Sequence, residues 1–192
     1  MTPEPARLPD VRVGSSAHGF EPVSAAAWDT SATPVQWLAL AAVAIAAFVA
    51  DQVTKHVVTS SLDLGESTHV VGPLDIHHVQ NTGIAFGLFG GATALVVLFT
   101  GAALVWMLVF FARSGSRHAL MPVALGFLIG GSASNLVDRV RLGHVTDFLD
   151  LGFWPAFNLA DSFICIGVAL LVYALFAAER TQPRLSPAGN GN

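Results

Sequence analysis

The stretch Gly90–Ala112, GGATALVVLFTGAALVWMLVFFA, contains no charged residue. A helix needs about 20 mostly apolar residues to cross the hydrocarbon core of a bilayer. Three further uncharged runs have a similar character: Val35–Ala50, Ala119–Val137 and Ser162–Ala178. We therefore expect an all-α membrane protein with four transmembrane helices, the first of which continues as helix through Asp51 and Lys55.

The composition of the whole chain agrees with this expectation. Of the 192 residues, 53% are hydrophobic and only 11% are charged, whereas soluble domains carry about 25% charged residues. The net charge of -4 comes without a basic tract, which argues against nucleic acid as a partner. The single cysteine, Cys165, excludes an intrachain disulfide and a cysteine-based zinc cluster.

The ends of the chain differ from its centre. Residues 1–34 and 179–192 are rich in small and polar residues and predict two disordered tails around one membrane domain at 35–178. Four crossings place both tails on one side, together with Arg113 and Arg117. Lys55, Arg139 and Arg141 fall on the other side, so the excess of arginine predicts cytoplasmic tails.

The long segment between the first two runs predicts structure of its own. Ser67–Val79 alternates apolar and polar residues in places around Gly72–Pro73, a pattern typical of a short hairpin. A further strand is expected over His144–Leu149, directly after Gly143. Because irregular backbone is tolerated at membrane depth only where protein or water satisfies it, we expect a small extracytoplasmic β-sheet.

Two aspartates near the apolar runs are the main candidates for chemistry, because a carboxylate close to hydrocarbon is costly. On a strand, Asp147 would share an inward face with Leu149, while Asp150 would point away. Asp161 stands at the start of the fourth run, where capping of the helix and catalysis are equally plausible. Asn158 could cap the same helix.

Other polar residues predict supporting roles. Asp51 and Lys55, four apart on a helix, suit an ion pair that anchors the first helix at the interface; shaping a substrate cavity is secondary. Asn81 and Gly83 belong to a turn-forming motif. It marks either the entry to the second helix or a binding point for peptide or lipid headgroup.

The third run carries small and polar residues together. Its glycines predict close packing between helices. Asn135, Asp138 and Arg139 follow at i, i+3 and i+4 and share one direction, which favours support of a site over direct chemistry. The seven histidines show no metal-ligand spacing on a shared helix face and are interpreted as surface residues.

Taken together, these motifs resemble the lipoprotein signal peptidases, the type II signal peptidases of bacteria. The stretches that carry the resemblance occur in the family's order: Asp51-x-x-x-Lys55, Asn81–Thr82–Gly83–Ile84–Ala85–Phe86–Gly87, Gly131-x-x-x-Asn135-x-x-Asp138–Arg139, Val145–Thr146–Asp147–Phe148 and Phe157–Asn158–Leu159–Ala160–Asp161–Ser162. The long N-terminal tail departs from the family pattern. The short segment between the aspartates leaves the shape of the substrate entrance open.

The resemblance implies an aspartyl endopeptidase of the bacterial cytoplasmic (inner) membrane, with its active site facing outward and a lipidated prolipoprotein as its substrate. By position, Asp147 and Asp161 match the catalytic pair, and Asn135, Arg139 and Asn158 match supporting residues. We expect cleavage N-terminal to the lipidated cysteine, no metal or other cofactor, contact with membrane lipid and a monomer.

Two carboxylates in a low dielectric cannot both ionise easily, so the expected chemistry is attack by water with one proton shared between them. One rival is a proton-coupled small membrane transporter that uses Asp138, Asp147 and Asp161 as a relay. Against it, the acids cluster at one face, away from the membrane midplane. A second rival is a non-enzymatic assembly factor that docks partners through its small-residue helix.

Overall fold

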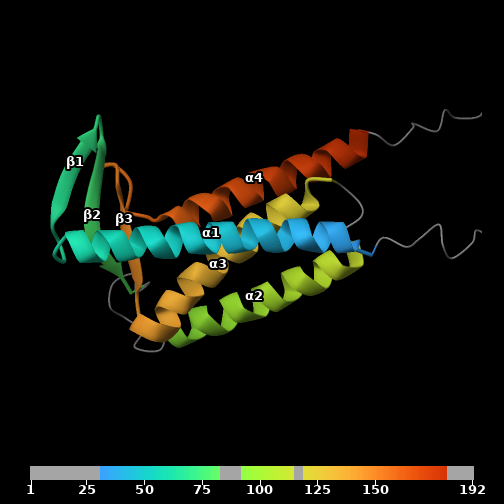
Figure 1. The fold of residues 1–192 in the computed structure, drawn as a ribbon, viewed down its shortest axis with the longest axis horizontal. Helices are drawn as coiled ribbons and strands as arrows, with labels where there is room; N and C mark the ends of the chain where they lie inside the picture. Colours follow the sequence, from blue (N-terminus) through green and yellow to red (C-terminus); the bar gives the residue numbers. More distant parts are fainter. Residues whose placement is uncertain (1–30, 83–91, 115–118, 181–192) are drawn as a thin grey trace, which may run out of the picture.

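Four helices and a three-stranded sheet make up the computed structural model, which describes residues 31–82, 92–114 and 119–180. The helices are α1 (Pro34–Ser61), α2 (Ala92–Ser114), α3 (Met121–Leu142) and α4 (Leu159–Arg180), and the strands are β1 (Ser67–Val71), β2 (Leu74–Asn81) and β3 (Val145–Asp150). The sheet stands at one end of the helices (Figure 1). The start of α1 and the end of α4 lie at the opposite end.

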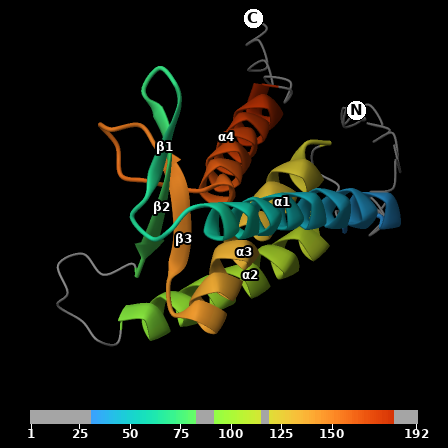
Figure 2. The same ribbon diagram turned by 60° about the vertical axis from the view of Figure 1, so that its left-hand side comes forward.

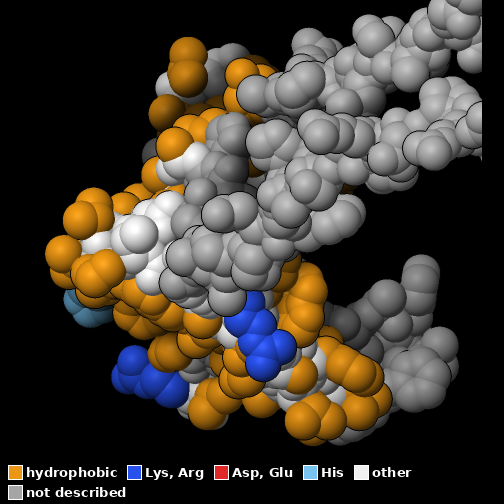
Figure 3. Space-filling view, turned by 90° about the vertical axis from the view of Figure 1, so that its right-hand side faces the viewer, with side chains coloured by type: hydrophobic (Ala, Val, Ile, Leu, Met, Phe, Trp, Pro, Cys, Tyr) orange, Lys and Arg blue, Asp and Glu red, His pale blue; other side chains and the backbone are white. Residues whose placement is uncertain are grey.

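The mostly helical fold and the small sheet were both predicted from the sequence. Each expected run lies within or largely overlaps an observed helix, and α1 extends beyond Lys55 to Ser61. Two helical segments, Pro34–Ser61 and Thr93–Arg113, are long and apolar enough to cross a membrane, and Leu159–Ala174 is a shorter apolar segment. Many large hydrophobic side chains on the helices are exposed, and they predominate among the described residues on the face in Figure 3.

Helix α3 is the centre of the bundle and contacts α1, α2 and α4. Its glycines explain how closely the helices approach, as the small-residue pattern predicted. A Cβ on Gly130 would lie 2.4 Å from the Ala44 carbonyl oxygen of α1, and one on Gly131 would lie 2.5 Å from the Ala160 carbonyl oxygen of α4. A side chain at either position would push two backbones apart. The spacing of the bundle beside the sheet therefore depends on these glycines.

The expected hairpin and third strand form one antiparallel sheet in the order β1-β2-β3. Gly72, at the hairpin turn, has φ 56°, and Gly143, which ends α3, has φ 80°, a region that glycine adopts without strain. Figure 2 shows β3 between β2 and the helices. The expected one-sided burial of β3 is wrong, because Thr146, Asp147 and Phe148 are all buried.

A candidate aspartic active site

Asp147 on β3 and Asp161 in the first turn of α4 are both hydrogen-bonded to Asn158, beside α3. The Asn158 side-chain nitrogen donates to Oδ1 of Asp147 at 2.7 Å. Its side-chain oxygen accepts from the Asp161 backbone N–H at 3.0 Å, and its own backbone N–H donates to Oδ2 of Asp161 at 3.3 Å. One buried amide therefore holds the two carboxyl groups in a fixed relation.

This arrangement also answers the question of what caps α4. The side chain of Asn158, directly before the helix, bonds to the backbone of Asp161, and the Asp161 side chain bonds back to the backbone of Asn158. The pair is a reciprocal capping box, with asparagine at the N-cap and aspartate at the third position. The expected capping role of Asp161 is thus confirmed, and its second oxygen accepts from Asn135 at 2.9 Å.

Two further amides complete the surroundings of the carboxylates. Asn81, the last residue of β2, donates to Oδ2 of Asp147 at 2.9 Å. Asn135 of α3 donates to Oδ1 of Asp161 at 2.9 Å. Asn81 therefore ends a strand and contacts the site, and the helix entry considered from the sequence is wrong for it. Gly83 lies outside the described residues.

Asp147 is almost fully buried, at 2% exposure, whereas Asp161 is only partly buried. Burial raises the pKa of Asp147 above its ordinary value of 3.8, and the negative charge of Asp161 raises it further. Hydrogen bonds from Asn81 and Asn158, and the charge of Lys55, oppose that rise without cancelling it. This local environment therefore favours retention of a proton by Asp147 at pH values where an ordinary aspartate is ionised.

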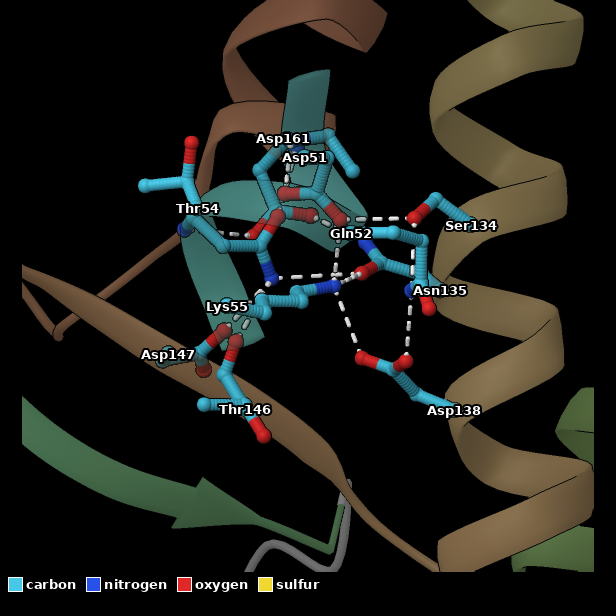
Figure 4. Close-up of polar contacts among 12 residues, drawn as sticks. Asp51, Gln52, Thr54, Lys55, Ser134, Asn135, Asp138, Thr146, Asp147 and Asp161 are labelled. Carbon is cyan, nitrogen blue, oxygen red and sulfur yellow. Dashed lines mark hydrogen bonds and ion pairs between the residues drawn. The ribbon is translucent and has the colours of Figure 1, made fainter. Parts of the chain in front are cut away.

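Lys55 lies at the centre of a second polar layer, formed with Asp51, Asn135 and Asp138 next to the aspartates (Figure 4). Its ammonium lies 2.6 Å from Oδ2 of Asp51 and 2.8 Å from Oδ2 of Asp138, and it donates to Oδ1 of Asn135 at 2.7 Å. Three oxygens therefore surround the ammonium, one from each of Asp51, Asp138 and Asn135. The bond to Asn135 fixes which end of that amide faces Asp161, and it directs the Asn135 nitrogen toward the carboxylate.

Asp51 connects this layer to α4. Its Oδ2 accepts from the Ser134 hydroxyl at 2.7 Å, and its Oδ1 accepts from the Ala160 backbone N–H at 2.8 Å. The expected ion pair of Asp51 and Lys55 is confirmed, and it is buried in the protein, with exposures of 0% and 5%. A buried charge requires several partners, and this pair obtains them from α3 and α4.

The polar stripe of α3 follows the helical repeat. Gly131, Ser134, Asn135 and Asp138 occupy positions i, i+3, i+4 and i+7, so they share one face. Asp138 accepts from the Gln52 side chain at 2.8 Å and pairs with Lys55, inside the protein. Asp138 is therefore part of the buried polar layer around Lys55.

Arg139, near the end of α3, donates to the Asn135 carbonyl oxygen at 3.3 Å. Gln52 of α1 and Ser134 of α3 also belong to the polar layer and were not predicted as site residues from the sequence. The only sequence signal for Ser134 was its place on the same stripe of α3.

Asp150, His77 and His78 make structural hydrogen bonds. Asp150 accepts from His77 at 3.0 Å and from the Gly152 backbone at 2.8 Å, and both bonds lower its pKa. The expectation that it points away from the site agrees with its partly exposed position. His78 is buried and hydrogen-bonds the Leu62 carbonyl oxygen at 3.0 Å, so a surface position is wrong for it. Across the described ranges, no group of three His, Cys, Asp or Glu side chains is placed to hold a metal ion.

Comparison with known proteins agrees with the geometry. The family described as signal peptidase (SPase) II matches residues 43–177. The chain is 36% identical over 133 residues to a protein of Halothermothrix orenii named lipoprotein signal peptidase, a match that covers 68% of this chain and 90% of that protein. A protein of the same name from Geobacter sulfurreducens is 39% identical over 149 residues, with 73% and 93% covered.

Two solved structures of bacterial membrane enzymes, both determined by the in meso method, have the same fold. One has a TM-score of 0.70 at 29% identity, covering 83% of this chain and 98% of the other. The second has a TM-score of 0.68 at 31% identity, covering 77% and 96%.

Proposed function

The chain belongs to the signal peptidase II family, and we propose that Asp147 and Asp161 form the aspartic dyad with which it cleaves its substrate. Membership makes it a protease that removes signal peptides from prolipoproteins. The aspartic mechanism rests on one observation: Asn158 hydrogen-bonds the side chain of Asp147 and the backbone and side chain of Asp161. Such an arrangement suits a proton shared by two acids.

In the proposed reaction, a water molecule attacks the scissile carbonyl without a covalent enzyme intermediate. The ionised member of the dyad takes a proton from this water, and the protonated member donates its proton to the carbonyl oxygen. Collapse of the resulting diol breaks the C–N bond, and a proton passes to the leaving nitrogen. The signal peptide leaves with a new carboxylate and the lipoprotein with a free α-amino group. The apparent pKa values belong to the pair, so neither acid is assigned alone.

The surrounding residues would orient the dyad without reacting. Asn81, Asn135 and Asn158 donate hydrogen bonds that favour one carboxylate arrangement over others. We assign a supporting role to Asp51, Lys55 and Asp138, which hold Asn135 and the first turn of α4 in place. Arg139 would stabilise the end of α3 through its bond to the Asn135 carbonyl oxygen. Gly83, in the motif that follows Asn81, is kept as a candidate on its sequence position alone.

We further propose that all four helices of residues 35–178 cross the bacterial inner membrane. Asp147 lies on β3 and Asp161 in the first turn of α4. The sheet stands at one end of the helices, and the start of α1 and the end of α4 lie at the other (Figure 1). With both tails, 1–34 and 179–192, in the cytoplasm, the dyad would face outward. The substrate would be a diacylglyceryl-modified prolipoprotein, cleaved N-terminal to the lipidated cysteine by a monomeric enzyme surrounded by lipid.

Asp147→Asn and Asp161→Asn test the dyad. Removing a general acid or base costs about 10²–10⁴-fold in rate, so each purified variant should cleave a lipidated prolipoprotein at least about 100-fold more slowly. Asp75→Asn is the matched control, because Asp75 is an exposed sheet carboxylate paired only with His69 among the described contacts. Full cleavage by either dyad variant would remove that residue from the mechanism.

The two rival functions predict different results for the purified protein and its variants. A proton-coupled transporter would show proton-dependent uptake in vesicles without proteolysis. An assembly factor would be indifferent to both substitutions. Family membership favours neither, since the matched family is a peptidase family.

A further inference from the structure

An apolar groove opens directly beside Asp161. It has a volume of about 520 Å³, within the range of pockets that bind small ligands. Its walls come from the loop between β3 and α4 and from the second turn of α4. The apolar residues that line it are Leu151, Phe153, Trp154, Phe157, Cys165 and Ile166. Asp161 and Ser162 stand among the lining residues at the first turn of α4.

The loop that forms one wall is held in place by the sheet. Phe157 pairs with Leu149 through backbone hydrogen bonds of 2.8 and 3.0 Å, which close the loop at its base. Asp150 accepts from the Gly152 backbone at 2.8 Å, which shapes its first turn. Phe153 and Trp154 are nevertheless 78% and 63% exposed. Two aromatic side chains are thus held open beside the site, where they are available to an apolar ligand.

We propose that this groove receives an acyl chain of the substrate's diacylglyceryl group, an inference that rests on the proposed function. The lipid is attached to the residue that follows the scissile bond, so its chains must begin close to the dyad. The groove contacts Asp161 and continues past Cys165, one helical turn along α4. An acyl chain placed there would leave the scissile bond beside the carboxylates.

The chemistry of the walls favours an acyl chain over a peptide segment. A peptide in this groove would need partners for its backbone N–H and C=O groups, and unpaired buried groups of this kind are costly. Ser162 already donates to the Asn158 carbonyl oxygen at 3.2 Å, and Asp161 already accepts from Asn135 and Asn158. An acyl chain needs no hydrogen bonds, and the burial of each methylene group contributes favourable free energy to binding.

Cys165 makes the inference testable, because it is the chain's single cysteine, is exposed and lines the groove. Alkylation with N-cyclohexylmaleimide in detergent should fill the groove and raise KM for a diacylglyceryl prolipoprotein by about tenfold, or ~1.4 kcal/mol. The lipidated substrate should also slow the alkylation of Cys165 in Asp147→Asn enzyme, where it is not consumed. A non-lipidated peptide of the same sequence should not.

Two variants serve as matched controls. Cys165→Ala should show the same KM with and without the reagent. The double variant Cys165→Ala/Val168→Cys moves the thiol to a position on α4 that is exposed but does not line the groove, so its alkylation should leave KM unchanged.

The possible failures are distinguishable. If the wild-type enzyme cleaves but alkylated Cys165 leaves KM unchanged, the groove assignment fails and the proposed function stands. If the non-lipidated peptide slows the alkylation of Cys165 equally well, the groove binds the peptide part of the substrate, and the proposed acyl-chain site is wrong. Absence of cleavage by the unmodified enzyme would instead contradict the proposed function.

Discussion

The backbone N–H of Ala160, in the first turn of α4, donates its hydrogen bond to the carboxylate of Asp51 on α1 at 2.8 Å. The first N–H groups of a helix have no partner within the helix, so Asp51 acts as a cap supplied by another helix. Ala160 precedes Asp161. The position of one proposed dyad member is therefore tied to a carboxylate more than a hundred residues earlier in the chain.

Asp51→Asn should impair both stability and catalysis. The side-chain NH₂ of the new asparagine would face either the Ala160 N–H or the Lys55 ammonium and Ser134 hydroxyl, which are themselves donors. A buried group left without a partner costs about 1–3 kcal/mol. The first turn of α4 would lose its restraint, and a displacement of about 1 Å can cost about 100-fold in rate. Thermal unfolding in detergent and kcat, measured well below the unfolding temperature, check the two effects.

Ser134→Ala is the matched control for this prediction. It removes the hydroxyl that donates to Asp51 at 2.7 Å and accepts from Gln52 at 3.0 Å, and it leaves Asp51 bonded to Lys55 and Ala160. Its effect on kcat should be several-fold smaller than that of Asp51→Asn. If Asp51→Asn keeps the wild-type kcat and unfolding temperature, Asp51 does not position the dyad.

The sequence predicted the elements of this fold because their signals are local. Hydrophobic runs predicted the helices, and Gly72–Pro73 predicted the hairpin. The spacing of Asp51 and Lys55 also predicted their ion pair. No local pattern could predict that Ser134, Asn135 and Asp138 would surround that pair, because the partners come from a helix some 80 residues away.

The wrong predictions also come from contacts between distant parts of the chain. His78 is polar and lies on a strand beside His77, a pattern that favours a surface position. It is nevertheless buried, and it hydrogen-bonds the backbone carbonyl oxygen of Leu62. On β3, alternation predicted one buried face. The strand is instead buried on both faces; α1 and α3 contact it, and β2 and Phe157 hydrogen-bond along its edges.

Asn81→Ala should move the pH dependence of cleavage to higher pH. The hydrogen bond from Asn81 lowers the pKa of Asp147, which burial has raised above 3.8. Removing this bond raises that pKa further, so the pair keeps its protons to higher pH. Both limbs of a kcat–pH profile should then shift in the alkaline direction.

Gln80→Ala is the control for this shift. Gln80 is exposed, and as the neighbour of Asn81 on a strand its side chain points to the other face of the sheet. Its profile should coincide with that of the wild type. A profile of Asn81→Ala that stays in place or moves toward acid would show that this bond does not control the ionisation on which cleavage depends.

Gly131→Ala should inactivate the enzyme by displacing α4. The added Cβ would lie 2.5 Å from the Ala160 carbonyl oxygen and 3.0 Å from Cγ1 of Ile164. Overpacking of this kind costs about 1–3 kcal/mol, and relief requires the first turn of α4 to move away from α3. Since that turn carries Asp161 and receives the Asp51 cap, kcat should fall together with the unfolding temperature.

Two other glycines separate lost stability from a displaced dyad. Gly101→Ala on α2 meets nothing within 4 Å, so it should leave kcat unchanged and stabilise the helix by up to about 1 kcal/mol. Gly130→Ala would meet the Ala44 carbonyl oxygen of α1 at 2.4 Å, an equally severe clash that lies against α1 and away from α4. Gly130→Ala and Gly131→Ala should therefore lose similar stability, while Gly131→Ala loses much more activity per folded molecule. Equal activity of the two folded variants would mean that the approach of α3 to Ala160 does not set the geometry of the dyad.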